Sequence, residues 1–158
     1  MTYLKDFCDC EIVQVDPLSP NAPFHLSLSR TLYIKHHQKD LFRQKIIDAL
    51  KCTELPTQLK CENIEIYLND EVTRTFVAID VENDDRILKS IGLVDKILED
   101  FGLPVYYKSP KLHYILYSCQ VNQKDKFKEF MSLDLLKEYQ VNIEGILMKF
   151  GNKVTRIR

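Results

Sequence analysis

Two of the four histidines stand in similar sequence contexts far apart in the chain. His25 belongs to Pro-Phe-His-Leu-Ser-Leu (23–28), and His113 belongs to Pro-Lys-Leu-His-Tyr-Ile-Leu (110–116). In both stretches a proline shortly precedes the histidine and a leucine lies three residues after it. An imidazole, with a pKa of about 6.5, can accept or donate a proton near neutral pH. Such a pair suits cleavage of RNA by its own 2′-hydroxyl, which needs a base for that hydroxyl and an acid for the leaving 5′-oxygen.

A hydroxyl accompanies the first of these histidines. Ser27 lies two residues after His25, so in an extended strand both side chains point to the same face. From that position the Ser27 hydroxyl can donate to a phosphate oxygen, where negative charge builds up in the transition state. The sequence therefore predicts that His25 and Ser27 together face a phosphate.

The same residues also allow a plain structural interpretation. A strand histidine beside serines is usually a surface or half-buried residue, and Lys108 and Lys111 near His113 would then be solvated loop side chains. His36 and His37 follow the first strand without matching partners, and we interpret them as structural.

Helical patterns alternate with strand patterns along the chain, and most of the strands are paired as hairpins. This arrangement predicts an α+β fold with antiparallel sheet. Asp84 or Asp85 is expected to begin a helix that ends at Gly102, and Gly151-Asn152 is expected to form a two-residue hairpin turn. The expected strands are 24–34, 64–68, 73–81, 112–119, 141–150 and 153–158, and the expected helices are 36–51, 85–101 and 124–139.

Composition indicates one intracellular globular domain over 1–158. The chain is 45% hydrophobic and 28% charged, and its net charge of −1 argues against a protein that coats nucleic acid through bulk charge. A local pocket for an RNA end remains allowed.

No apolar run approaches the ~18 residues of a membrane span. The cysteines have no metal-site spacing, so we expect no zinc, and the first residues show no apolar signal segment, so we expect no disulfides. The cysteines are Cys8, Cys10, Cys52, Cys61 and Cys119.

On these residues the chain resembles the U6 small nuclear RNA phosphodiesterases, within the two-histidine (LigT-like) phosphoesterase superfamily. The resemblance implies a single two-lobed α+β domain, with antiparallel sheets in pseudo-twofold symmetry around a central groove and helices outside. The matching segments are FHLSLSRTLYIKHHQ (24–38), IYLNDEVTRTFVAIDV (66–81), VDKILEDFG (94–102), YYKSPKLH (106–113) and the GNK turn (151–153).

The resemblance also implies an activity. It is that of a 3′-to-5′ exoribonuclease that shortens the oligouridine end of U6 RNA without metal or other cofactor. The product end is a 2′,3′-cyclic phosphate, which some members open to a 3′-phosphate. RNA would be the partner of a monomeric protein without membrane attachment, located in the nucleus or also in the mitochondrion.

Residue by residue, the resemblance assigns the catalytic pair to His25 and His113. We expect His113 to be the base of the exonuclease step and His25 the acid, with the roles exchanged if the ring is opened. Ser27 would bind the phosphate and Tyr107 would stack on the terminal base. The remaining expected substrate-binding residues are Ser109 and Lys111.

One departure from the family pattern concerns the second strand. The family has His-x-Ser or His-x-Thr in both strands, but Ile115 stands two residues after His113. Strand alternation predicts that Tyr117 shares the face of His113. Our hypothesis is that Tyr117, a backbone amide or a water replaces the serine. The alternative is an asymmetric, slower phosphate clamp.

Two further functions compete with the exonuclease. A LigT-like hydrolase of other cyclic phosphate ends or nucleotides would use the same two histidines. A non-catalytic RNA-binding module would follow if Ile115 had ended turnover. Tyr107, as a platform for a base, favours the exonuclease.

Overall fold

The structure is a computed structural model that describes residues 12–14, 25–69, 71–120 and 139–158. By its contacts the chain divides into two compact units that interleave in sequence. The first unit comprises 1–26, 60–82 and 112–140, and the second comprises 27–59, 83–111 and 141–158. The helix expected at 124–139 lies outside the described residues except for Tyr139, as do Cys8 and Cys10.

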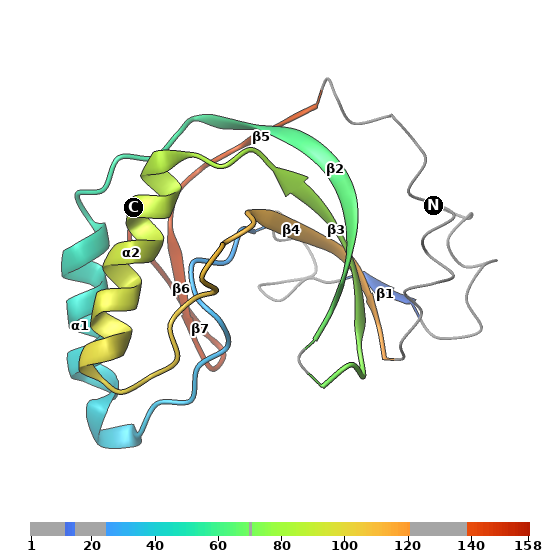
Figure 1. The fold of residues 1–158 in the computed structure, drawn as a ribbon. Helices are drawn as coiled ribbons and strands as arrows, with labels where there is room; N and C mark the ends of the chain where they lie inside the picture. The colour runs from blue at the N-terminus through green and yellow to red at the C-terminus, as the bar shows by residue number, and fades with distance from the viewer. Residues whose placement is uncertain (1–11, 15–24, 70, 121–138) are drawn as a thin grey trace. The chain divides into compact units, whose positions relative to one another are not determined.

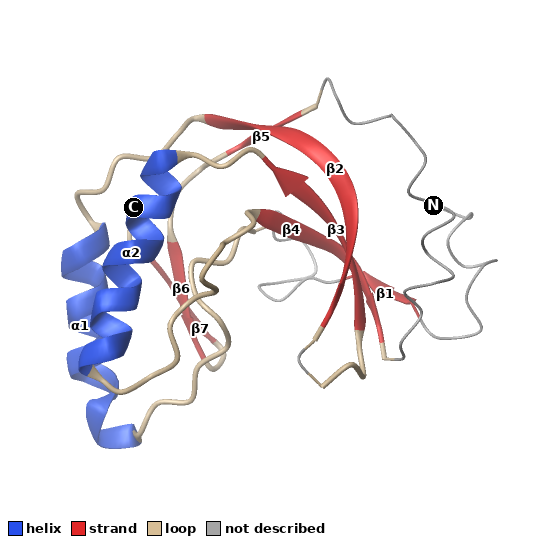
Figure 2. Cartoon of the chain, viewed as in Figure 1, coloured by secondary structure: helices blue, strands red, loops and turns tan. Residues whose placement is uncertain are grey.

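An antiparallel sheet dominates the first unit (Figures 1 and 2). The strand pairs β1–β4, β3–β4 and β2–β3 are antiparallel, and Figure 1 shows β2 and β3 curving strongly along their length. The sheet has the order β1-β4-β3-β2-β5. Its strands are β1 (Ile12–Gln14), β2 (Gln58–Leu68), β3 (Thr75–Val81), β4 (His113–Cys119) and β5 (Gln140–Asn142).

The turn that joins β2 to β3 is held by one asparagine. The side-chain oxygen of Asn69 accepts hydrogen bonds from the backbone N–H groups of Thr73 and Arg74, both at 2.8 Å. Asparagine is favoured in turns because its short side chain can satisfy backbone donors nearby. The hairpin expected from the strand patterns at 64–68 and 73–81 is confirmed.

The second unit contains the two α-helices of the described residues. A short 3-10 turn, η2 (His36–Gln38), leads into α1 (Lys39–Leu50), and α2 is Asp85–Asp100. Asp84 caps α2 by accepting from the backbone N–H of Arg86 at 2.9 Å. At the other end Gly102 adopts a φ of +63°, which glycine tolerates without the penalty of a Cβ atom. The predicted limits of α2 are confirmed within one residue, whereas the helix expected from residue 36 begins at Lys39, after the 3-10 turn.

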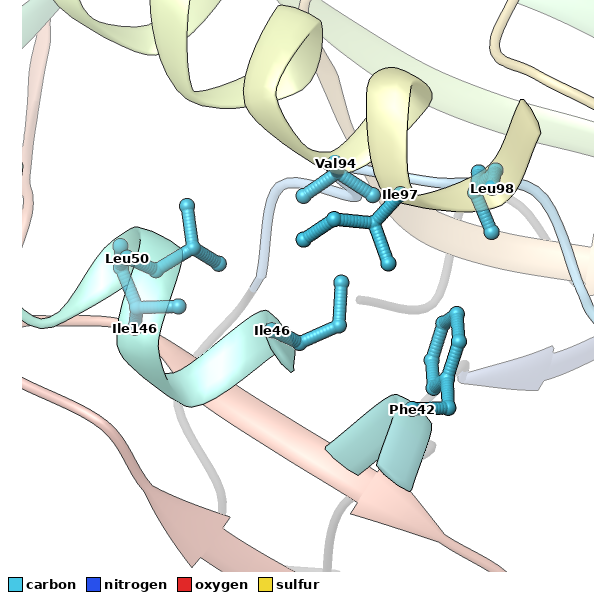
Figure 3. Packing of buried hydrophobic residues seen from close by; sticks show 7 residues of the cluster. All are labelled: Phe42, Ile46, Leu50, Val94, Ile97, Leu98 and Ile146. Carbon is cyan, nitrogen blue, oxygen red and sulfur yellow. The ribbon is translucent and has the colours of Figure 1, made fainter. Parts of the chain in front are cut away.

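The helices pack on each other through apolar side chains, and a C-terminal hairpin of β6 (Leu147–Phe150) and β7 (Lys153–Arg156) completes this unit. Figure 3 shows the side chains of the two helices pointing toward one another. Gly151, at a φ of +54°, supplies the turn that was predicted between β6 and β7. The buried cluster consists of Phe42, Ile46, Leu50, Val94, Ile97, Leu98 and Ile146.

Two strand predictions are wrong. The expected strand at 24–34 is reduced, among the described residues, to a single bridge from Leu26 to Tyr114. Its apolar residues Leu28, Leu32 and Ile34 instead pack against the helical cluster, so the alternation reflects one-sided burial of an irregular extended chain. The expected strand at 141–150 is broken because Ile146 enters the same cluster.

Candidate active site

The register of β4 against β3 determines which way His113 points. The Cα partner of His113 is Asp80, and the partner of the next residue, Tyr114, is Ile79. Paired residues in an antiparallel sheet share a face, and successive residues point to opposite faces. We call the face that carries His113 and Asp80 the site face, and the face that carries Tyr114 and Ile79 the core face.

The bridge between Leu26 and Tyr114 brings the backbone beside His25 next to the strand that carries His113. This bridge is antiparallel, so Leu26 shares the core face with Tyr114. His25 immediately precedes Leu26, and His113 immediately precedes Tyr114. Counting one residue back from Leu26 and one residue forward from Tyr114, the antiparallel register sets His25 across from Ile115. The fold thus sets each of the two predicted histidines one residue before a member of this bridged pair, and both histidines are half-buried.

The core face anchors the strand that carries His113. Tyr114 is 7% exposed, and its hydroxyl lies 3.7 Å from the thiol sulfur of Cys61. Burial, with a further contribution from the contact to Cys61, raises the pKa of the Tyr114 hydroxyl above its ordinary value. Tyr114 is therefore a neutral core residue throughout the working pH range of most enzymes. Its buried side chain holds β4 in place on the core face.

A tyrosine that the sequence analysis did not single out lies against His113. The ring of Tyr67 stacks on the imidazole with a centroid distance of 4.4 Å and an interplanar angle of 22°. The Tyr67 hydroxyl donates to Oδ1 of Asp80 at 2.6 Å, and Asp80 is only 6% exposed. A signal was present in the sequence: Tyr67 and Asp80 both alternate with apolar neighbours in a hairpin. Nothing in that pattern, however, linked them to His113.

The prediction that alternation puts Tyr117 on the face of His113 is wrong. Ala78 pairs with Ile115, whereas Val77 pairs with Tyr117, so β4 contains one extra residue at this point. Such a bulge reverses the facing of every residue beyond it. Tyr117 shares the face of Val77, which is the core face. The residue shifted onto the site face is Ser118, roughly 13 Å along the strand from His113.

Ile115 itself remains on the site face. It is half-buried, and its partner across the β3–β4 ladder is Ala78. Neither side chain can donate a hydrogen bond to a phosphate oxygen. Within the part of β4 that lies close to His113, no side-chain hydroxyl on the site face takes the place of the family's second serine.

The other predicted residues belong to the second unit. Ser27, Ser109 and Lys111 are exposed, and Tyr107 is 52% exposed. The guanidinium of Arg30 lies over the Tyr107 ring, 4.7 Å from its centroid. The roles predicted for these four residues at the site stay predictions.

Neither a metal centre nor a membrane span is found in the described part of the chain. Within these residues, no group of three or more His, Cys, Asp and Glu side chains is arranged to hold a metal ion. No described helix has the length and apolar character that a membrane crossing would need.

Comparison with known proteins then decides the family. The family model HVSL, described as an uncharacterised conserved protein, matches residues 8–158. The chain belongs to the HVSL family. This HVSL chain is 31% identical over 149 residues to U6 snRNA phosphodiesterase 1 of Xenopus laevis, which covers 86% of this chain and 58% of the relative. It is 28% identical over 160 residues to the Drosophila melanogaster protein of the same name, covering 95% and 62%.

The resemblance to U6 snRNA phosphodiesterases is therefore confirmed, although the HVSL chain spans only 58% and 62% of the length of these two relatives. Two solved structures of Kluyveromyces marxianus Usb1 share its fold at 18% sequence identity and cover 86% of this chain. One has a TM-score of 0.55 over 74% of that chain. The other, with uridine monophosphate, has a TM-score of 0.59 over 75%. The predicted mixture of antiparallel sheet and helices is confirmed by this likeness.

Proposed function

We propose that this HVSL protein is a 3′-to-5′ RNA exonuclease that shortens the oligouridine end of U6 snRNA without a metal ion. The observation that carries the proposal is the antiparallel bridge between Leu26 and Tyr114, the residues that directly follow His25 and His113. Relatives named U6 snRNA phosphodiesterase 1 and a Usb1 structure with uridine monophosphate support the choice of substrate.

In the proposed reaction the two imidazoles move two protons. His113 removes the proton from the 2′-hydroxyl of the penultimate nucleotide, and that oxygen attacks the adjacent phosphorus. His25 gives a proton to the 5′-oxygen of the last nucleoside as its bond to phosphorus breaks. The nucleoside leaves with a 5′-hydroxyl, and the shortened RNA ends in a 2′,3′-cyclic phosphate. If water then opens the ring to a 3′-phosphate, the two histidines exchange roles.

The phosphate clamp is asymmetric in this proposal. Ser27 donates to a phosphate oxygen, whereas Ile115 offers no donor from the second strand. Tyr107 stacks on the terminal base, an interaction worth about 1–3 kcal/mol that tolerates different bases. Ser109 and Lys111 complete the substrate contacts.

The proposal includes a finer description of the fold. One domain over 1–158 consists of two lobes in pseudo-twofold symmetry around a groove, with helices outside. The bridge supports this: Leu26 follows His25, Tyr114 follows His113, and these two equivalent residues pair antiparallel, as they would beside a twofold axis. We propose that the protein is located in the nucleus, or in both the nucleus and the mitochondrion. It would act there as a monomer whose partner is RNA.

A competing function is favoured by Ile115. A site that lacks one phosphate donor could bind an RNA end without cleaving it, as a non-catalytic RNA-binding module. A LigT-like phosphodiesterase of other cyclic phosphate ends or nucleotides would use the same two histidines. The experiment must therefore separate cleavage of RNA, opening of a small cyclic nucleotide and binding alone.

The test compares two substrates in EDTA: a 3′-hydroxyl oligouridine RNA and a uridine 2′,3′-cyclic phosphate. The proteins are the wild type, His25→Ala and His113→Ala, with His36→Ala and His37→Ala as matched controls because both are exposed. We expect stepwise shortening of the RNA that falls about 10²-fold or more in the first two variants, as loss of an acid or base requires, and persists in the controls.

Each other outcome contradicts the proposal in its own way. Opening of the cyclic nucleotide with no shortening of RNA would indicate the LigT-like activity. Binding of RNA with neither reaction would indicate the binding module. Shortening that survives in both His25→Ala and His113→Ala would remove the two histidines from the mechanism.

A further inference from the structure

We propose that Tyr67 is a positioning residue for His113, holding the imidazole by ring stacking while Asp80 fixes the tyrosine. This inference rests on the proposed function, since it gives His113 a catalytic role. It assigns a role to a side chain that does not belong to the histidine and serine motifs.

The stacked geometry limits how the imidazole can move. With ring centroids 4.4 Å apart and planes inclined by only 22°, Tyr67 covers one side of the His113 ring. Rotation of the imidazole about its Cβ–Cγ bond would drive its edge into the tyrosine ring. The stack therefore fixes the plane in which the two ring nitrogens lie, and proton transfer depends on that orientation.

A hydrogen bond in turn fixes the tyrosine. The Tyr67 hydroxyl donates to Oδ1 of Asp80 at 2.6 Å, in the short range typical of a hydroxyl that donates to a charged carboxylate. Asp80 is only 6% exposed, so its carboxylate depends on partners within the protein. Losing this bond would free the tyrosine ring and leave a buried oxygen with one donor fewer.

The three side chains come from three neighbouring strands. Tyr67 lies in β2, Asp80 in β3 and His113 in β4, and Asp80 is the Cα partner of His113. The pairing of these strands is thereby coupled to the orientation of one imidazole. Packing alone would be served equally by a phenylalanine beside an apolar residue, without the cost of burying a carboxylate.

The activity test uses two substitutions of different severity. Tyr67→Phe keeps the ring and loses the hydroxyl, whereas Tyr67→Leu loses both, and Tyr33→Leu is the matched control because Tyr33 is 89% exposed. We expect Tyr67→Leu to lower kcat on oligouridine by about 10²-fold with little change in KM, as expected for a misplaced catalytic group. Tyr67→Phe should retain kcat within about tenfold of the wild type. The control variant Tyr33→Leu should have the kcat of the wild type.

A second readout does not depend on activity. In nuclear magnetic resonance spectra the carbon-bound ring protons of His113 should be shifted upfield by the stacked tyrosine ring. That shift should persist in Tyr67→Phe and disappear in Tyr67→Leu, while thermal melting shows that both variants remain folded. Unfolding of Tyr67→Leu would leave Tyr67→Phe against the wild type to decide. A smaller upfield shift and a kcat lowered by up to about tenfold are expected, because the ring has lost its bond to Asp80. Values equal to those of the wild type would overturn the proposal.

Unchanged His113 signals in a folded Tyr67→Leu variant would overturn the proposal, as would an unchanged kcat. If the wild type shortens no RNA, the proposed function fails on its own, and the spectra then decide alone whether Tyr67 orients the imidazole. Loss of the shift in Tyr67→Leu would support the positioning role, and its persistence would refute it.

Discussion

Ile115 is the residue on the site face that departs from the family pattern. It stands where the pattern has serine or threonine, and the register sets it across from His25. A hydroxyl at this point would donate to the phosphate as its charge grows, whereas the sec-butyl side chain of isoleucine has no hydrogen-bond donor. Under the proposed function, Ile115 should therefore give a slower reaction than a symmetric clamp would give.

Restoring the hydroxyl should make the enzyme faster. We expect Ile115→Ser to raise kcat on oligouridine by up to about 10²-fold, because one well-placed donor to a developing negative charge is worth that much. The cost should be about 1–3 kcal/mol in the free energy of unfolding, since a half-buried apolar side chain is lost. Single-turnover kinetics and urea titration measure the two effects.

Ile115→Val serves as the control, because it shortens the side chain without adding a donor. A folded Ile115→Ser variant no faster than Ile115→Val would show that this position does not contact the reacting phosphate.

At the scale of elements, β4 shows what alternation can and cannot predict. The sequence correctly indicated a strand beginning near His113, and correctly paired the two halves of the 66–81 hairpin. It could not reveal the extra residue between the partners of Ala78 and Val77, because a bulge leaves no mark in an apolar run such as Tyr-Ile-Leu-Tyr. That single residue turned Tyr117 to the core face.

The helices were the more predictable elements. Each limit of α2 has a local cause: Asp84 accepts from the first-turn backbone, and Gly102 takes the left-handed conformation. The strand expected at 24–34 was not found because its apolar residues are buried by tertiary packing and not by pairing with another strand. Leu28 and Ile34 pack against the buried cluster that α1, α2 and Ile146 form, and a local pattern cannot distinguish such burial from strand pairing. The stack of Tyr67 on His113 was missed for the same reason.

The cap of α2 gives a prediction about stability. Asp84→Ala should lower the free energy of unfolding by about 1 kcal/mol, because the backbone donors of the first helical turn lose their acceptor. Asp84→Asn keeps a capping oxygen and should lose less. Thermal or urea denaturation at pH 7 measures both, and a melting temperature for Asp84→Ala equal to that of the wild type would contradict the capping role.

The same cap has a defined pH dependence. Hydrogen bonding to the Arg86 side chain lowers the pKa of Asp84 below its ordinary value. A carboxyl group whose pKa is lower in the folded state contributes stability above its unfolded pKa of about 3.9, and loses it as the pH falls through the folded pKa. The stability difference between the wild type and Asp84→Asn should therefore diminish below about pH 4.

At the scale of the whole molecule, the chain passes repeatedly between its two units. His25 and His113 both lie within two residues of such a passage, as do Ser27 and Lys111. Length, composition and the alternation of elements were enough to predict the class of fold. The interleaving of the units was not predictable from local patterns, because it depends on which distant segments bury one another.

The central claim is that two histidines catalyse the attack of the RNA's own 2′-hydroxyl on the adjacent phosphorus. The most direct measurement uses two oligouridines in EDTA that differ only in the penultimate nucleotide, one with a 2′-hydroxyl there and one with a 2′-hydrogen. We predict that the first loses its last nucleoside and gains a 2′,3′-cyclic phosphate, as read by mass, while the second stays intact. Equal shortening of both RNAs would show that another nucleophile attacks the phosphorus, and would contradict the account.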